Sequence, residues 1–216
     1  MTSPLVDYYR QIEPVITKYA HDPRRAAQLL EEAGLVKGPD GFYVDRDGKR
    51  FGFDYRTFPG QRGEEENAVF VDSLRRAGID ARQLPFSQAE IRDGQALALF
   101  PALSFRGTGA RAALYMHISK EIPRAETRWQ GRNLGGWSNP EYDRLFQLFT
   151  GTLDRSETVR LIAQMEKAFT EELPSIVHYF IPGVNAHVGA LKGPEVALVP
   201  GAGGGWSHVY RWAWQQ

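Results

Sequence analysis

Asn133-Leu-Gly-Gly-Trp-Ser-Asn-Pro-Glu-Tyr-Asp143 begins the segment from which the architecture of this chain can be inferred, and Leu173-Pro-Ser-Ile-Val-His-Tyr179 ends it. Two amphipathic patterns lie between these ends and predict a pair of helices. Asn139 is typical of an N-cap and Pro140 of the first helical position, where proline loses no hydrogen bond. The predicted apolar faces consist of Tyr142, Leu145, Phe146 and Phe149 in the first helix and of Val159, Ile162, Met165, Phe169 and Leu173 in the second.

The boundaries of the second helix are marked as well. Asp154 is typical of an N-cap, and Pro174 is expected to stop the helix because proline cannot continue it. The apolar run at residues 176–181 then predicts a buried strand.

The remainder of the chain predicts an α/β fold, with helices flanking a mixed sheet. A helix is expected between Asp22, its N-cap, and Gly34, its left-handed C′ residue. Its buried face should consist of Ala26, Leu29, Leu30 and Ala33. The other expected elements are an irregular lead-in at 4–20, strands at 42–45, 51–58, 79–84, 96–103, 184–188 and 209–214, helices at 64–77, 87–92 and 110–117, a hairpin turn at 47–48, and loops at 60–63, 120–130 and 201–205.

Composition excludes several classes of function. The 216 residues carry 26 basic and 26 acidic side chains, so no general attraction to nucleic acid or to anionic membrane is expected. The chain has no cysteine, which excludes disulfides, thiol catalysis and thiolate metal sites. No window approaches the roughly 18 apolar residues of a membrane span. Residues 1–10 show neither the basic nor the apolar region of a signal peptide.

Motifs for catalysis are weak. Gly107-Thr-Gly109-Ala-Arg-Ala112 has the form of a dinucleotide fingerprint, with Glu126 as the acidic residue that should end a second strand. A glycine-rich connection at a cleft rim is the favoured interpretation, and a dinucleotide-binding oxidoreductase stays an alternative. The five histidines form no metal motif and accompany no nucleophile motif. We therefore predict no catalytic residue, no metal site and no cofactor.

The order of these motifs resembles the C-terminal half of family 5 extracellular solute-binding proteins, which are the peptide-binding components of ABC importers. The matching residues are Gly136, Trp137, Asn139, Pro140, Glu141, Tyr142, Asp143, Asp154, Leu173, Pro174 and Ile176. The segment Asp22-Pro-Arg-Arg-Ala-Ala-Gln-Leu-Leu-Glu-Glu-Ala-Gly-Leu35 is similar to a second signature of the family. The resemblance covers about the last half of the family's usual length, so a partial binding protein is expected.

This resemblance implies the C-terminal lobe of a two-lobed (class II) periplasmic binding protein. Residues 21–188 would form the lobe, residues 1–20 would lead into it, and residues 189–216 would return to the other lobe. It implies a peptide or other small-molecule ligand, an ABC permease as partner, and a periplasmic or extracellular location. It implies no catalysis.

Candidate ligand contacts follow from the same comparison. Peptide-binding members of the family usually carry an aspartate after the central strand, whereas this chain has Arg106 and Arg111 there, which favours an anionic or uncharged ligand, or a lost function. Trp137 either stacks on a ligand or covers the helix pair. The predicted cleft lining consists of Ser104, Arg106, Thr108, Tyr115, Asn133 and Trp137. An alternative function is self-association through the terminal aromatics Trp206, Trp212 and Trp214.

Overall fold

The computed structural model describes residues 2–59, 64–101, 103–108, 110–180, 186–193 and 209–215. The chain divides into two compact units. Unit 1 comprises residues 1–18, 108–123 and 130–216, and unit 2 comprises residues 19–107 and 124–129. Each unit has its own hydrophobic core, so we describe them separately.

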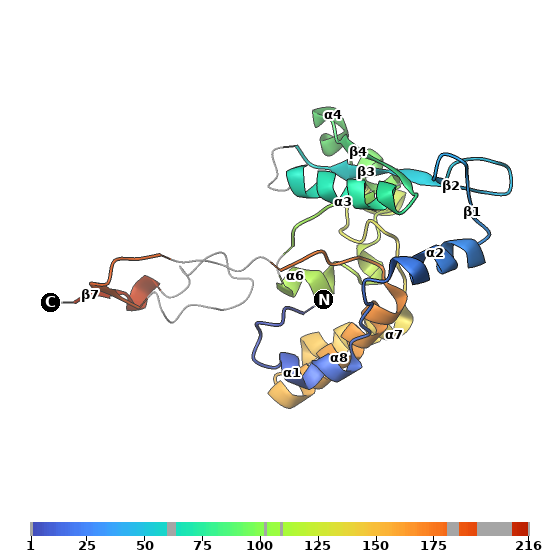
Figure 1. Ribbon diagram of the computed structural model, residues 1–216. Helices are drawn as coiled ribbons and strands as arrows, with labels where there is room; N and C mark the ends of the chain where they lie inside the picture. The colour runs from blue at the N-terminus through green and yellow to red at the C-terminus, as the bar shows by residue number, and fades with distance from the viewer. Residues whose placement is uncertain are drawn as a thin grey trace. The chain divides into compact units, whose positions relative to one another are not determined.

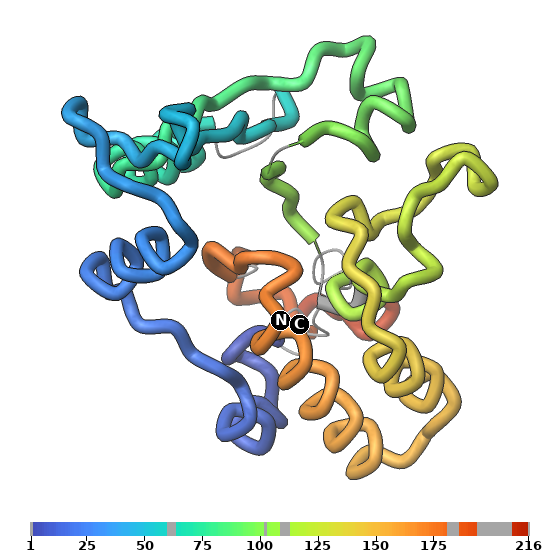
Figure 2. The backbone as a smooth tube through the Cα atoms, turned by 90° about the vertical axis from the view of Figure 1, so that its right-hand side faces the viewer, coloured from blue at the N-terminus to red at the C-terminus, as the bar shows by residue number. Residues whose placement is uncertain are grey.

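The core of unit 1 is built on two helices, α7 (Pro140–Gly151) and α8 (Arg155–Glu172), which run side by side (Figure 1). The path of the backbone from one to the other can be followed in Figure 2. The core contains the predicted apolar stripes together with Ile12 of α1 (Tyr9–Ile12). Its buried residues are Ile12, Ile118, Tyr142, Leu145, Val159, Leu161, Ile162, Met165 and Phe169. The predicted helix pair is therefore confirmed, although Leu173, which ends α8 in a left-handed conformation, is 39% exposed.

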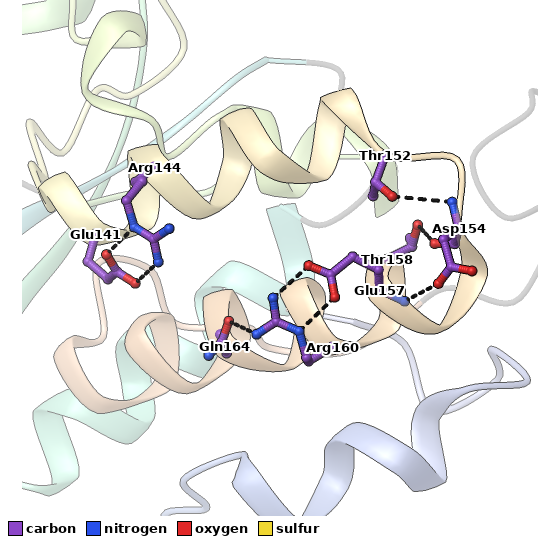
Figure 3. Close-up of polar contacts among 8 residues, drawn as sticks. All are labelled: Glu141, Arg144, Thr152, Asp154, Glu157, Thr158, Arg160 and Gln164. Atoms are coloured by element: carbon purple, nitrogen blue, oxygen red, sulfur yellow. Dashed lines mark hydrogen bonds and ion pairs between the residues drawn. The ribbon is translucent and has the colours of Figure 1, made fainter.

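Both helices begin at the predicted caps. Asn139 Oδ1 accepts the backbone N–H of Tyr142 at 2.9 Å, and Asp154 Oδ1 accepts that of Glu157 at 2.7 Å. Figure 3 shows the second cap together with the ion pairs Glu141–Arg144 and Glu157–Arg160 on the exposed faces. Exposed pairs of this kind contribute little to stability, so the caps and the buried stripes account for the helix pair.

The N-terminal segment of unit 1 is hydrogen-bonded to α8. The Thr2 hydroxyl donates to the buried Glu166 carboxylate at 2.6 Å, and the Thr17 N–H donates to Thr170 Oγ1 at 3.0 Å. Between these two contacts, α1 is followed by a 3₁₀ turn, η1 (Glu13–Val15), which agrees with the irregular lead-in expected at 4–20. The other elements of unit 1 are the helix α6 (Ala110–Tyr115), the 3₁₀ turn η2 (Ser119–Glu121), and the antiparallel pair β6 (Leu191–Lys192) and β7 (Ala213–Trp214).

The strand predicted at 176–181 is wrong over its described part. Residues 176–180 form no strand, and Ile176 is 62% exposed. The prediction failed because an apolar run becomes a buried strand only where a neighbouring strand offers its backbone, and none is placed beside residues 176–180 in the described structure. The strand at 184–188 is absent from 186–188, and its first two residues lie outside the described ranges, as does the turn at 201–205. The strand predicted at 209–214 is limited to β7 (Ala213–Trp214).

Unit 2 is organised around a parallel sheet with the order β4-β3-β5. Its strands are β3 (Gly52–Thr57), β4 (Asp80–Pro85) and β5 (Leu103–Ser104). The helix α3 (Glu64–Arg76) connects β3 to β4 and packs on them. The buried core consists of Tyr55, Val71 and Ala81, with Phe70 and Leu74 partly buried against it.

The α/β class is confirmed, with parallel and antiparallel pairing distributed over small sheets. The outer elements of unit 2 are α2 (Pro23–Glu32), the antiparallel pair β1 (Val36–Lys37) and β2 (Tyr43–Val44), the helices α4 (Gln88–Arg92) and α5 (Gly94–Leu99), and the 3₁₀ turn η3 (Ala125–Thr127). The turn at 47–48 forms, with Asp45 Oδ1 accepting the N–H groups of Asp47 and Lys49. The loop at 60–63 lies outside the described residues.

Two predictions for unit 2 are corrected. The helix α2 forms as expected, with Asp22 accepting two N–H groups, but none of its residues is buried and Leu29 is 50% exposed. Residues 96–99 of the strand predicted at 96–103 form the end of the helix α5 instead, because Asp93 caps this helix by accepting the N–H groups of Gln95 and Ala96, whereas Leu103 begins β5. An N-cap therefore decides between helix and strand for an apolar run whose pattern fits both.

Candidate functional site

Asn133 is a buried organiser of a loop in unit 1. It is 3% exposed, and its Nδ2 donates to the carbonyl oxygens of Trp137 at 2.7 Å, Ile118 at 3.2 Å and His117 at 3.3 Å. Its Oδ1 accepts the N–H of Trp137 at 3.2 Å. These bonds join two segments of the chain, and every polar atom of this amide is engaged inside unit 1.

Trp137 lies over the helix pair of unit 1. Its Nε1–H donates to the Glu172 carboxylate at 2.6 Å, and its ring meets the Tyr142 ring edge to face at 4.9 Å between centroids. The ring also approaches Phe169 and His117, each at 6.5 Å. Of the two alternatives for Trp137, this geometry is that of a cover over α7 and α8.

Tyr115 and Thr108 also belong to unit 1, and both are exposed. The Tyr115 hydroxyl donates to the Glu121 carboxylate, and that hydrogen bond raises the pKa of the tyrosine above its ordinary value. The Tyr115 ring lies 6.3 Å from that of Phe146. The ring of Tyr115 therefore lies near α7, and its hydroxyl is engaged by Glu121 of η2.

Ser104 and Arg106 lie in unit 2, where the parallel sheet ends. Ser104 is the last residue of β5 and pairs with Arg56 of β3. The Arg106 guanidinium lies over the Phe58 ring at 4.9 Å. The six predicted contacts are thus divided between the units. Asn133 and Trp137 are hydrogen-bonded to each other in unit 1, and in unit 2 Arg106 lies two residues after Ser104, the last residue of β5.

His117 was not singled out by the sequence, and the structure gives it a specific role. Its Nδ1 lies 2.7 Å from the Ala113 carbonyl oxygen, which can only accept, so Nδ1 carries the proton. Its Nε2 then accepts a hydrogen bond from Ser175 Oγ at 2.9 Å. Because Ser175 follows α8 and lies 58 positions away, no local motif could indicate this contact.

The stability of unit 1 is expected to fall as the solution is acidified. Burial lowers the pKa of His117, against the opposing effect of its hydrogen bond to Ala113, and burial also lowers the pKa of His178. In the unfolded chain a histidine takes up a proton at about pH 6.5, whereas in the folded state these two histidines take it up only at a lower pH. The stabilisation is thus complete above that pH and is lost as the pH falls below it.

Urea unfolding at pH 7.5 and 5.5 measures this loss. His117→Gln should show a smaller decrease between the two pH values than the unchanged chain, and His21→Gln, at an exposed position, should show the full decrease. An equal decrease in all three proteins would contradict the role assigned to His117.

The acidic residue that the dinucleotide-binding alternative requires is not at the position where it would be needed. Glu126 lies in the 3₁₀ turn η3 and not at the end of a parallel strand, where it would have to be to bind a ribose. Among the described residues, no group of three histidine or acidic side chains is placed to hold a metal ion. Within the same ranges, no helix combines the length and the hydropathy that crossing a bilayer demands.

The fold of the chain is that of part of a two-lobed periplasmic solute-binding protein. NikZ from Campylobacter jejuni, solved with Ni(L-His), superposes with a TM-score of 0.64 over 92% of this chain and 40% of its own, at 16% identity. The oligopeptide-binding protein AppA from Bacillus subtilis, solved with a nonapeptide, superposes with a TM-score of 0.60 over 93% of this chain and 39% of its own, at 20% identity. A periplasmic oligopeptide-binding protein from Thermotoga maritima, solved with mannohexaose, superposes with a TM-score of 0.66 over 80% of this chain and 34% of its own, at 21% identity.

Sequence comparison adds a short match. Over 68 residues, 31% of this chain and 12% of the relative, the chain is 33% identical to AppA of Bacillus subtilis. No family model matches the sequence. The resemblance to peptide- and nickel-binding solute-binding proteins is therefore confirmed, and the chain spans less than half the length of these proteins.

Proposed function

We propose that this chain is the C-terminal lobe part of the substrate-binding component of an ABC importer for peptides or similar small solutes. The observation that carries the proposal is the superposition of more than nine-tenths of the chain on NikZ and AppA, which were solved with Ni(L-His) and a nonapeptide. In this proposal residues 21–188 form the lobe, residues 1–20 lead into it and residues 189–216 return to the other lobe.

Binding proteins with two lobes trap a ligand by hinge closure, and the loaded protein then docks on the membrane permease. We assign the ligand contacts of unit 2 to Ser104 and Arg106 and those of unit 1 to Thr108 and Tyr115, whereas Asn133 and Trp137, also predicted as contacts, hold the loop of unit 1 together. The protein would act in the periplasm or at the outer cell surface. Its role would be binding without catalysis.

A thermal-shift screen of the 216-residue chain tests the proposal. Di- to pentapeptides, nickel chelates, sugars and small anions form the panel. A ligand at a hundred times its Kd stabilises the folded state by about 2.7 kcal/mol, which corresponds to a rise in Tm of roughly 5–10 °C for a chain of this size. A panel without any shift, on a sample that unfolds cooperatively, would contradict binding by this chain.

Self-association is the second candidate function. Tyr210 and Trp214, at the β6–β7 pair, are 72% and 68% exposed, and large exposed apolar groups are commonly covered by a partner. Light scattering after size-exclusion chromatography shows whether the chain is a monomer or self-associates. A dimer that Trp214→Ser converts to a monomer supports self-association, and a monomer at all concentrations excludes it.

A further inference from the structure

The helix α2 of unit 2 has an apolar face that remains largely exposed. The stripe predicted to be buried consists of Ala26, Leu29, Leu30 and Ala33, yet none of the residues of α2 is buried and Leu29 is 50% exposed. Ala26 and Ala33 are exposed as well, and Leu30 is half-buried. An amphipathic helix of a folded protein normally turns such a stripe toward a core or a partner. The stripe of α2 is therefore a surface on which a partner can pack.

The short length of α2 also favours a partner. Because most helical stability comes from packing of the apolar face, isolated helices shorter than about 12–15 residues are only marginally stable in water. The ten residues of α2 begin at a well-formed cap, since Asp22 accepts the N–H groups of Arg24 and Arg25. A cap fixes where a helix begins but buries no apolar surface. A second surface on the stripe would supply the packing that α2 lacks.

One edge of the stripe carries opposite charges at its two ends. Arg25 lies in the first turn of α2, and Glu32 is its last residue. Leu29 lies four residues after Arg25 and three before Glu32, so both charged side chains are its neighbours on the helix surface. The two side chains are 52% and 60% exposed and form an ion pair at 2.9 Å. This edge of α2 is therefore positive at one end and negative at the other.

Antiparallel pairing of two copies of α2 matches these charges. A two-fold axis is the commonest symmetry of protein dimers, and it brings the same surface of both copies together. With the helices antiparallel, Arg25 of each copy lies beside Glu32 of the other copy. A parallel pair would place each end beside the same end of the other copy and would gain no such attraction.

One register serves both the apolar stripe and the charges. The stripe from Ala26 to Ala33 and the charged pair from Arg25 to Glu32 have midpoints that differ by only one residue. Leu29 and Leu30 then lie close to the two-fold axis in both copies. The side chains of arginine and glutamate are long enough to adjust to an offset of this size, since a residue adds only about 1.5 Å along a helix.

We propose that α2 is an interface between two copies of this chain, which pair their α2 helices antiparallel about a two-fold axis. Stable interfaces bury about 1,200–2,000 Å², and one face of a helix about 15 Å long offers less, so the dimer is weak. We expect a Kd on the order of 10–100 µM. The inference is independent of the proposed function, and it uses a different surface from the β6–β7 pair.

Sedimentation equilibrium of the full chain tests this interface, at concentrations from about tenfold below to about tenfold above the expected Kd. Leu29→Ser should raise the Kd about tenfold or more, because it places a polar group at the centre of the apolar contact. Leu148→Ser is the matched control, since Leu148 of α7 is 45% exposed, and it should leave the Kd unchanged.

Charge reversal tests the antiparallel arrangement. Arg25→Glu alone and Glu32→Arg alone should each raise the Kd about tenfold, because each brings like charges together across the interface. The double exchange should restore the Kd, and an equimolar mixture of the two single variants should pair more tightly than either variant by itself. An acidic first turn and a basic last turn both suit the helix dipole, so the exchanges should leave the circular dichroism spectrum unchanged.

Each outcome decides the role of α2. A monomer over the whole concentration range overturns the inference, as does a dimer that Leu29→Ser leaves intact or that Leu148→Ser weakens equally. A double exchange that stays monomeric with an unchanged circular dichroism spectrum overturns the antiparallel arrangement. A dimer that dissociates only in Trp214→Ser belongs to the β6–β7 pair and overturns the role of α2. The thermal-shift panel decides the proposed function separately.

Discussion

Leu161→Ala is expected to lower the free energy of unfolding of unit 1 by about 2–5 kcal/mol, the range measured for buried leucines. Leu161 is fully buried and belongs to the core shared by α1, α7 and α8. Truncation removes apolar surface from the core and leaves a cavity that rigid neighbours on three helices can fill only in part. Urea unfolding followed by circular dichroism measures the change.

Leu153→Ala is the matched control, since Leu153 lies in the connection between α7 and α8 and is fully exposed. The same chemical change there should cost less than about 0.5 kcal/mol, as surface substitutions usually do. Equal effects of the two substitutions would mean that the α7–α8 core does not determine the stability of unit 1.

The helix pair could be predicted from the sequence because its determinants are local. Asn139 and Asp154 each cap a helix through an N–H three residues along, and the apolar stripes repeat within each helix. The same holds for α4, whose capping box joins Ser87 and Glu90. Sequence position and spatial contact coincide in these elements, so a pattern is sufficient.

The failed strands depended on information that the sequence does not hold locally. Residues 176–180 have the composition of a strand, yet composition does not say whether a neighbouring strand is present. Residues 96–99 have a similar apolar composition, and Asp93 at the cap decides for the helix α5. The exposed face of α2 shows that a correct helix prediction does not fix what the helix packs against.

The surroundings of the candidate residues could be predicted only in part. The position of Arg106 after the last strand of the sheet follows from the sequence, but its stacking on Phe58, 48 positions earlier, follows only from the parallel register. His117 and Ser175 are likewise distant in the chain. Asn133 shows the same limit, because its amide donates to the carbonyl oxygens of His117 and Ile118, which no local pattern around Asn133 indicates.

Asn133→Asp is expected to lower the free energy of unfolding of unit 1 by about 2–4 kcal/mol, because buried carbonyl oxygens lose their donor and gain a neighbouring negative charge. The amide nitrogen that the substitution removes donates to the carbonyl oxygens of His117, Ile118 and Trp137. The carboxylate has the same shape, so the effect reports on hydrogen bonding and charge and not on packing. Gln147→Glu, the same chemical change at an exposed position of α7, should have little effect.

The pH dependence of the Asn133→Asp variant separates this structural role from simple ligand contact. Desolvation should raise the pKa of a buried aspartate at this position, so the folded variant would bind a proton more readily than the unfolded chain. Its deficit in stability relative to the unchanged chain should therefore shrink as the pH is lowered from 7.5 to 5.5, since a protonated carboxyl can again donate to a carbonyl oxygen. A residue that only lines a ligand site would leave the urea midpoint of the free protein unchanged at both pH values and would lower ligand affinity alone.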